Sequence, residues 1–230
     1  MRNRREFLLP DFLIVIFILF TMGVSGLDVQ SIGPEGTRIG FASINGALMS
    51  HLSYNHTFYM VSEILGYVAL LLVAAFGCLG LYQLIKRKSL LKVDKSILVL
   101  GIFLVLVLLF YVLFNHMIVN YRPIIMDGEL EPGYPSSHTM LAICVFYMSG
   151  AALMEITNSP QLAASIRKAL YALMALTVVC RFLSGVHWAT DIIGAVLLSA
   201  AICSMYNAVL DHMKALQESM DKQERRKAGN

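Results

Sequence analysis

The chain has 230 residues, of which 57% are hydrophobic and only 14% are charged, and its formal net charge is +3. A composition this apolar excludes a soluble globular domain, so we expect an integral membrane protein. The small positive charge fits contacts with anionic lipid head groups and gives no reason to expect nucleic acid as a partner.

Six apolar runs are long enough to cross a bilayer, which takes about 20 helical residues. They predict an all-α fold, with one membrane domain over residues 1–230 and transmembrane helices near residues 8–27, 58–85, 96–119, 138–156, 166–184 and 188–210. The first run resembles a secretory signal, but it is long and an even number of spans needs it, so we interpret it as an uncleaved anchor. Residues 211–230 are expected to form a cytoplasmic tail.

Lysine and arginine residues are concentrated in alternate loops, and this pattern predicts the topology. They lie before the first span and after the second, fourth and sixth spans: Arg2, Arg4 and Arg5; Lys86, Arg87, Lys88, Lys92 and Lys95; Arg167 and Lys168; Lys214, Lys222, Arg225, Arg226 and Lys227. The other loops hold only Arg38, Arg122 and Arg181. We therefore expect both termini in the cytoplasm and these three loops on the outer side. The sequence does not indicate an oligomeric state.

Two outer segments that precede the third span could border a site. Residues 39–52 have apolar side chains spaced for a short amphipathic helix in the membrane interface, which could cover a site, line a lipid entrance or be a plain connector. Glu63 lies close to the outer end of the second span, where it is either a head-group contact or a polar neighbour of a site.

The third span ends in N-H-M-I-V-N-Y-R-P, which puts Arg122 at the outer membrane surface, next to a proline that ends the helix. The loop that follows is acidic. We interpret its carboxylates as a solvated rim rather than as metal ligands, because no histidine lies among them at ligand spacing. These residues are Asp127, Glu129 and Glu131.

The fourth span begins with the sequence P-S-S-H, residues 135–138. A proline followed by serines favours a helix start at which a serine side chain caps the helix, as Ser136 or Ser137 could do here. The free backbone N–H groups of such a start can bind an anion. His138 lies on the first turn, at the same outer level.

The stretch C-R-F-L-S-G-V-H-W-A-T-D, residues 180–191, places Arg181, His187 and Asp191 at the edge of an apolar segment. On a helix, His187 and Asp191 would share one face, so that the carboxylate could accept a hydrogen bond from the imidazole and fix its tautomer. Such a histidine can act as a base or a nucleophile, and a guanidinium beside it suits a phosphate. The alternative is an interfacial pair with an arginine that extends to the head groups.

The predicted topology places these three outer stretches on the same side of the membrane. Two arginines, two histidines, an orienting carboxylate and a helix N-terminus supply the positioning and charge neutralisation that phosphoryl transfer needs. The stretches resemble the three signature motifs of the type 2 phosphatidic acid phosphatase (PAP2) superfamily. These motifs are Lys, six residues, Arg-Pro; then Pro-Ser-(Gly or Ser)-His; then Ser-Arg, five residues, His, three residues, Asp. They correspond to Asn115–Pro123, Pro135–His138 and Cys180–Asp191.

The resemblance implies a PAP2-like bundle of six helices and a role for each matching residue. His187, oriented by Asp191, would attack the phosphorus, and His138 would donate a proton to the leaving group. The phosphate would be held by Arg122, Arg181, Ser136 and Ser137. The resemblance implies neither a metal ion nor another cofactor.

The chain departs from the family pattern at two positions. Asn115 stands where the family has lysine, which leaves Arg122 and Arg181 as the cations of the motifs, and Cys180 replaces the serine before Arg181. Asn115, His116 and Tyr121 are secondary candidates for the site. The four cysteines have no paired spacing, so we interpret them as small buried apolar residues: Cys78, Cys144, Cys180 and Cys203.

We therefore predict a multi-pass phosphatase of the cell membrane that acts at the extracytoplasmic face, and its size resembles that of short bacterial family members. Its substrate would be a lipid phosphate or pyrophosphate: an isoprenoid carrier such as undecaprenyl pyrophosphate, phosphatidic acid or phosphatidylglycerol phosphate. Two alternatives remain open. One is a phosphotransferase that passes the phosphoryl group to another molecule, and the other is a non-catalytic lipid binder or transporter of the same fold.

Overall fold

The computed structural model describes residues 2–126 and 128–228. Six long helices dominate it: α1 (Leu8–Gly26), α3 (His56–Arg87), α4 (Lys95–His116), α5 (Ser137–Ile156), α6 (Pro160–Leu183) and α7 (Ala189–Ala228). The shorter elements are helix α2 (Ala42–Met49) and the 3-10 turns η1 (Arg2–Phe7), η2 (Pro34–Gly36) and η3 (Leu90–Lys92). Each long helix contains a segment apolar enough to cross a bilayer. The all-α fold with six membrane helices is thus confirmed, and the chain is a multi-pass membrane protein.

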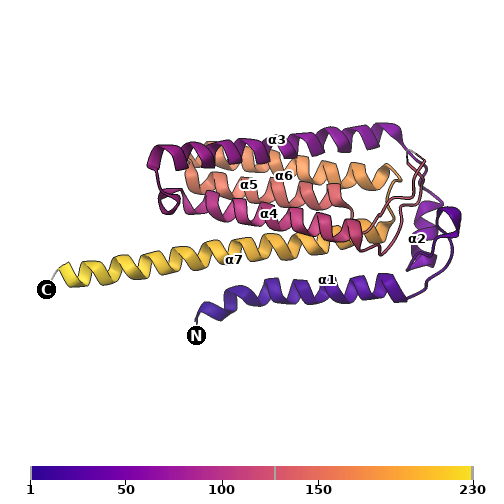
Figure 1. The fold of residues 1–230 in the computed structure, drawn as a ribbon, viewed down its shortest axis with the longest axis horizontal. Coiled ribbons are helices and arrows are strands. Elements are labelled where there is room, and N and C mark those ends of the chain that lie inside the picture. Colours follow the sequence, from indigo (N-terminus) through magenta and orange to yellow (C-terminus); the bar gives the residue numbers. More distant parts are fainter. Residues whose placement is uncertain (1, 127, 229–230) are drawn as a thin grey trace.

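Helix α5 lies in the middle of the bundle, in contact with α3, α4, α6 and α7, while α1 packs along α7 at one side (Figure 1). Just over half of the apolar segment in each of α5 and α7 is buried within the protein. The other four long helices leave more of their apolar surface exposed, as expected where lipid rather than protein covers them. The two most enclosed membrane helices are therefore those that carry the histidine of the second motif and the aspartate of the third.

Several helix ends differ from the prediction. α4 ends at His116, three residues earlier than expected. α6 begins at Pro160, six residues earlier, because a proline at the first helical position has no need of an N–H partner. α7 runs as one helix through Ala228, far beyond its apolar segment. By contrast, residues 39–52 contain a helix of only eight residues, α2.

Different connections lie at the two ends of the bundle. The chain termini and the basic α3–α4 connection lie at one end, whereas α2 and the α4–α5 and α6–α7 loops gather at the other end (Figure 1). Figure 1 therefore places all three motif stretches at the end of the bundle away from the termini.

Helix α2 covers the start of α7 through one buried asparagine. The Asn45 amide donates to Thr190 Oγ1 and to the Gly40 carbonyl, each at 2.9 Å. In return, the Thr190 N–H donates to Asn45 Oδ1 at 3.3 Å. Of the three roles open to this segment, the contacts favour a cover, because they hold α2 against the residue next to Asp191.

The loop before α5 is anchored by Tyr134, which is buried among α1, α4 and α7. Its hydroxyl lies 2.7 Å from Thr21 Oγ1 on α1, and its ring stacks on Phe17. Burial raises the pKa of Tyr134 to about 12, so the phenol stays neutral. Tyr134 thereby fixes the chain immediately before the second motif.

Replacing Gly194 with alanine should destabilise this anchor, because a Cβ atom at Gly194 would lie 2.7 Å from the Tyr134 hydroxyl oxygen and closer still to its ring. We expect a loss of about 1–3 kcal/mol, as for other overpacked cores, seen as a lower thermal midpoint in detergent. The matched control is Gly101→Ala, where a Cβ meets nothing within 4 Å. This control should be neutral or stabilising by up to about 1 kcal/mol. Equal midpoints for the two variants would contradict the proposed packing.

Candidate active site

Three loop contacts bring the motif stretches together. The Trp188 indole N–H donates to the Tyr121 carbonyl at 2.8 Å, which joins the third motif to the first. The Ser136 N–H donates to the Asp191 carbonyl at 3.1 Å, which joins the second motif to the third. A Cβ atom at Gly133 would lie 2.7 Å from Asp191 Oδ2, so glycine is needed for this close approach.

His187 is at the centre of this cluster and is only 1% exposed. It precedes α7, which begins at Ala189, so the expectation that it shares a helical face with Asp191 is wrong. The turn still brings His187 Nδ1 to 3.5 Å from Asp191 Oδ2, which itself accepts the Trp188 backbone N–H at 3.1 Å. Within the described part of the chain, neither ring nitrogen of His187 has a hydrogen-bond partner, and Nδ1 is the one that faces Asp191.

The environment of His187 disfavours its charged form. Burial, and then the nearby charges of Arg181 and Arg122, lower the pKa of His187 well below its ordinary value. The imidazole is therefore neutral at pH 7. A neutral ring with one nitrogen near a carboxylate and the other without a partner has a lone pair available for attack.

The start of α5 differs in one detail from the predicted cap. The Ser136 hydroxyl makes no hydrogen bond to the helix backbone and instead donates to Thr139 Oγ1 at 3.0 Å. Ser136 is fully buried, whereas Ser137, the first helical residue, is half-buried. The first N–H to bond within the helix is that of Met140, which donates to the Ser136 carbonyl, so the preceding N–H groups have no intrahelical acceptor. They remain available to an anion.

Arg181 is fully buried at the end of α6, under the N-terminal part of α3. Its Nη1 donates to Glu63 Oε1 at 2.8 Å and to Ser62 Oγ at 3.3 Å, and its guanidinium carbon lies 5.3 Å from the centre of the Tyr59 ring. Among the described residues, its Nε and Nη2 have no acceptor. Half of the guanidinium is thus held by α3, and the other half can bind a ligand.

Arg122 is paired with the acidic loop. Its Nη1 lies 2.8 Å from Glu131 Oε2, and its backbone N–H donates to the Glu131 carbonyl at 3.0 Å. Glu131 is still a rim residue, because its side chain is 37% exposed, but it also pairs with Arg122. Glu129 is exposed, as a rim residue would be, and Asp127 lies outside the described residues.

Glu63 is the residue that the motif analysis left least defined, and it contacts two site residues. The same Oε1 atom that binds Arg181 lies 3.2 Å from His138 Nε2. Glu63 is thus a polar neighbour of the site. The sequence contained a signal for this: Tyr59, Ser62, Glu63 and Gly66 recur at the spacing of one helical face.

The secondary candidates are placed differently. Asn115 and His116 are exposed on the last turn of α4, where His116 Nδ1 is 2.8 Å from the Val112 carbonyl of the same helix. Tyr121 lies in the loop and contributes its carbonyl to Trp188. The nearby Asn120, which sequence reasoning missed, is 1% exposed and lies beside Asp191.

The cysteines agree with their predicted role in three of four cases. Cys144, Cys180 and Cys203 are buried, and all four thiols are free. Cys78 is exposed on α3, so the expectation of burial is wrong there. A bundle in a bilayer can turn a small apolar side chain outward without cost, since lipid is as apolar as the core.

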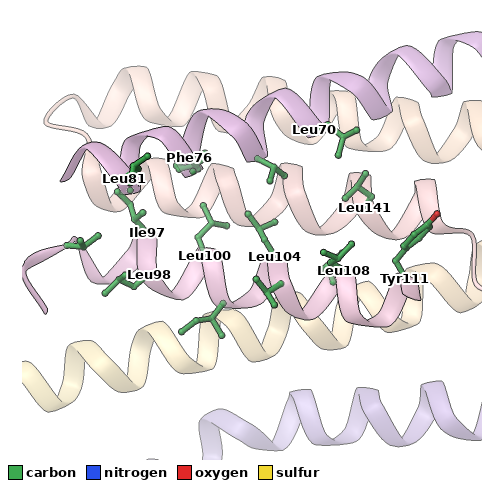
Figure 2. A pocket seen from close by; sticks show the side chains of 18 of the residues that line it. Leu70, Phe76, Leu81, Ile97, Leu98, Leu100, Leu104, Leu108, Tyr111 and Leu141 are labelled. Carbon is green, nitrogen blue, oxygen red and sulfur yellow. The ribbon is translucent and has the colours of Figure 1, made fainter. Parts of the chain in front are cut away.

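A large apolar pocket opens between α3 and α4 and reaches the site at one end. Its volume is about 1060 Å³, and its walls include Leu70 and Phe76 of α3, Leu100 and Leu104 of α4, and Leu141 of α5 (Figure 2). Ser137 and His138 also line it. The α4 residues that line it run from Ile97 to Tyr111, a distance of about 21 Å along a helix. The arrangement is a polar cluster continuous with an apolar channel.

Comparisons with known proteins agree with the motif resemblance. Residues 116–213 match the sequence model of the PAP2 superfamily. The fold is similar to the crystal structure of the first transmembrane PAP2 type phosphatidylglycerolphosphate phosphatase from Bacillus subtilis, with a TM-score of 0.65 and 16% sequence identity. That similarity covers 89% of this chain and 96% of the other. A search among curated proteins found no match.

Proposed function

We propose that the protein is a membrane phosphatase that hydrolyses a lipid phosphate through a phosphohistidine, because residues 116–213 match the sequence model of the PAP2 superfamily. One observation carries the proposal: His187 is buried beside Asp191, at the place where loop contacts join the stretches that carry Arg122, His138 and Arg181. Such a constellation positions a nucleophile beside groups that neutralise phosphate charge.

In the first step the lone pair of His187 Nε2 attacks the phosphorus atom. The new N–P bond forms as the P–O bond to the lipid breaks, and the lipid oxygen keeps the electron pair. His138 donates a proton to this oxygen, so the lipid leaves as an alcohol. Asp191 stabilises the positive charge that develops on the His187 ring.

In the second step a water oxygen attacks the same phosphorus. Its proton passes to His138, the N–P bond breaks, and the electron pair returns to His187 Nε2. The products are inorganic phosphate and the free enzyme. No metal or other cofactor is part of this scheme, because Arg122, Arg181 and the free N–H groups of α5 carry the phosphoryl charge.

The apolar pocket supports a lipid as the substrate. A chain that lies along α3 and α4 would bring its head group to Ser137 and His138, which line the same pocket. A substrate anchored in the bilayer by its tail reaches this pocket by moving laterally, so its binding does not depend on attraction of a free anion over a distance. This suits a site whose rim carries Glu129 and Glu131.

Narrowing the pocket should impair long-chain substrates selectively. Leu104→Trp puts a larger side chain into the channel, so we expect kcat/KM for a C16 alkyl phosphate to fall about tenfold or more. The value for a C4 alkyl phosphate should change less than about twofold, since its tail stops short of the obstruction. The matched control is Leu109→Trp on the same helix, at a residue that is 60% exposed. Equal losses for both chain lengths would refute the pocket as the site of the tail.

The proposed site faces the extracytoplasmic side. The basic residues of the α3–α4 connection lie with the termini at the opposite end of the bundle (Figure 1), and such loops remain in the cytoplasm. An impermeant thiol reagent applied to intact cells tests this. It should label Glu35→Cys, in the outer loop, but not Glu218→Cys, near the C-terminus, both in a background whose native cysteines are changed to serine.

The function itself is tested by phosphate release from purified protein in detergent with a chelator. The panel is undecaprenyl pyrophosphate, phosphatidic acid and phosphatidylglycerol phosphate. Chelator-resistant release of free phosphate supports the proposal. A phosphorylated acceptor in place of free phosphate would indicate a phosphotransferase. Binding of a lipid phosphate without turnover would indicate a non-catalytic binder or transporter.

A further inference from the structure

His138 has a carboxylate partner that lies outside all three motifs. Glu63 Oε1, on α3, is 3.2 Å from His138 Nε2, and the imidazole fits against α3 at Gly66, where a Cβ atom would lie 3.2 Å from His138 Cδ2. Any side chain at Gly66 would press on the ring. Helix α3 thus presents both a carboxylate and a recess to the same histidine.

The contact leaves the two nitrogens of His138 in different situations. Nε2 faces Glu63, whereas Nδ1 is buried and has no hydrogen-bond partner among the described residues. In His187, Nδ1 lies 3.5 Å from Asp191 Oδ2, and neither ring nitrogen has a hydrogen-bond partner among the described residues. Each histidine therefore has one nitrogen beside a carboxylate and one left for chemistry.

We propose that Glu63 is a positioning residue for His138, with its carboxylate accepting the Nε2–H so that Nδ1 exchanges protons with the substrate. This inference rests on the proposed function and adds a second histidine–carboxylate pair to it. A carboxylate beside an imidazole fixes the tautomer and stabilises the imidazolium. His138 thus enters the first step as an imidazolium that can give up its Nδ1 proton.

The proton balance follows from this assignment. When the P–O bond breaks, the Nδ1 proton moves to the lipid oxygen, and His138 becomes neutral with its remaining proton on Nε2, shared with Glu63. The Nδ1 lone pair then takes a proton from water in the second step. The Nε2 proton never leaves, and Glu63 stays ionised throughout.

Glu63 contacts Arg181 as well as His138, and other charged groups lie close by. Arg181 donates to the same Oε1 atom at 2.8 Å, so this carboxylate oxygen is shared between Arg181 and His138. Tyr59, Arg122, His187 and Asp191 are the other titratable or charged groups around the cluster. Because Glu63 touches both Arg181 and His138, an experiment must separate its effect on proton transfer from an effect on phosphate binding.

Comparing two substrates with different leaving groups separates an effect on proton transfer from an effect on phosphate binding. An alkyl oxygen needs a proton to depart, whereas a nitrophenolate is stable without one. Glu63→Gln keeps the shape of the side chain and removes its charge. We expect kcat/KM to fall about 30-fold for a C16 alkyl phosphate but less than about threefold for 4-nitrophenyl phosphate.

In a His138→Asn background, Glu63→Gln should lower kcat/KM less than about twofold for either substrate, since the two residues act as one unit. Glu35→Gln, at an exposed carboxylate in the same outer region, is the matched control.

Each other outcome overturns the inference. Equal losses for the two substrates, or an undiminished loss in the His138→Asn background, would mean that Glu63 acts through Arg181 or the fold. A gain in activity would mean that Glu63 competes with phosphate. Should Glu63→Gln fail to fold, Glu63→Asp keeps the charge and must still show the larger loss with the alkyl phosphate. Failure of the proposed function is recognised separately, because the parent would then release no phosphate.

Discussion

Replacing His187 with asparagine is expected to lower phosphate release at least about a thousandfold, as befits the loss of a covalent nucleophile. Asparagine fills much of the same volume and keeps a nitrogen near Asp191, so the buried site should still fold. It has no lone pair that can form a stable bond to phosphorus. The measurement is kcat for phosphatidylglycerol phosphate in detergent, with mass spectrometry of acid-sensitive, base-stable phosphate on the rapidly quenched parent.

The matched control is His51→Asn, at an exposed histidine outside the site, which should retain full activity. An unchanged thermal midpoint in His187→Asn would exclude unfolding as the cause of the loss. If His187→Asn kept a tenth or more of the parent's activity, the phosphohistidine would have to be abandoned, even if the protein proved to be a phosphatase.

Replacing Arg181 with lysine should lower kcat/KM about 100-fold, within the range for removing one preorganised donor group. Lysine keeps the positive charge and can still pair with Glu63, so the protein should fold. All three lysine donors sit on one nitrogen, so they cannot reach Glu63 and a phosphoryl group from separate positions, as Nη1 and the Nε and Nη2 atoms of Arg181 can. Steady-state kinetics on a lipid phosphate would measure the loss.

Arg38→Lys provides the comparison, because Arg38 is an exposed arginine of the α1–α2 connection and should tolerate the change. A loss below about threefold in Arg181→Lys would show that charge alone is required there. The guanidinium would then have no special role in holding phosphate.

Much of this architecture could be predicted from the sequence, because hydrophobic length and short motifs are local properties. Six runs of apolar residues specify six helices, and the positions of Arg122, His138 and Arg181 follow from motif spacing. Helix ends were less predictable. The turn before α7 moves His187 off the helix, yet the residue still reaches Asp191 by a different geometry.

The partners of the site residues could not be predicted in the same way. Glu63 and Glu131 are ordinary carboxylates in sequence, and their roles depend on which helix and loop lie opposite them in space. The exposed position of Asn115 depends on the rotation of the last turn of α4, which spacing alone does not specify. Contacts between distant segments, such as that of Asn45 with Thr190, likewise carry no local signal.

The ion pair between Arg122 and Glu131 has a consequence for turnover. An unpaired guanidinium at the edge of a low-dielectric region is costly, and Glu131 removes that cost while no lipid is bound. An arriving phosphate would therefore replace the Glu131 carboxylate on Arg122. The net gain in binding free energy would be the small difference between the attraction of Arg122 for phosphate and its attraction for Glu131. In the proposed reaction, inorganic phosphate has no tail in the apolar pocket, so it would lose this exchange to Glu131 and depart. Glu131 would thereby limit product inhibition and leave discrimination between substrate and product to the hydrocarbon tail.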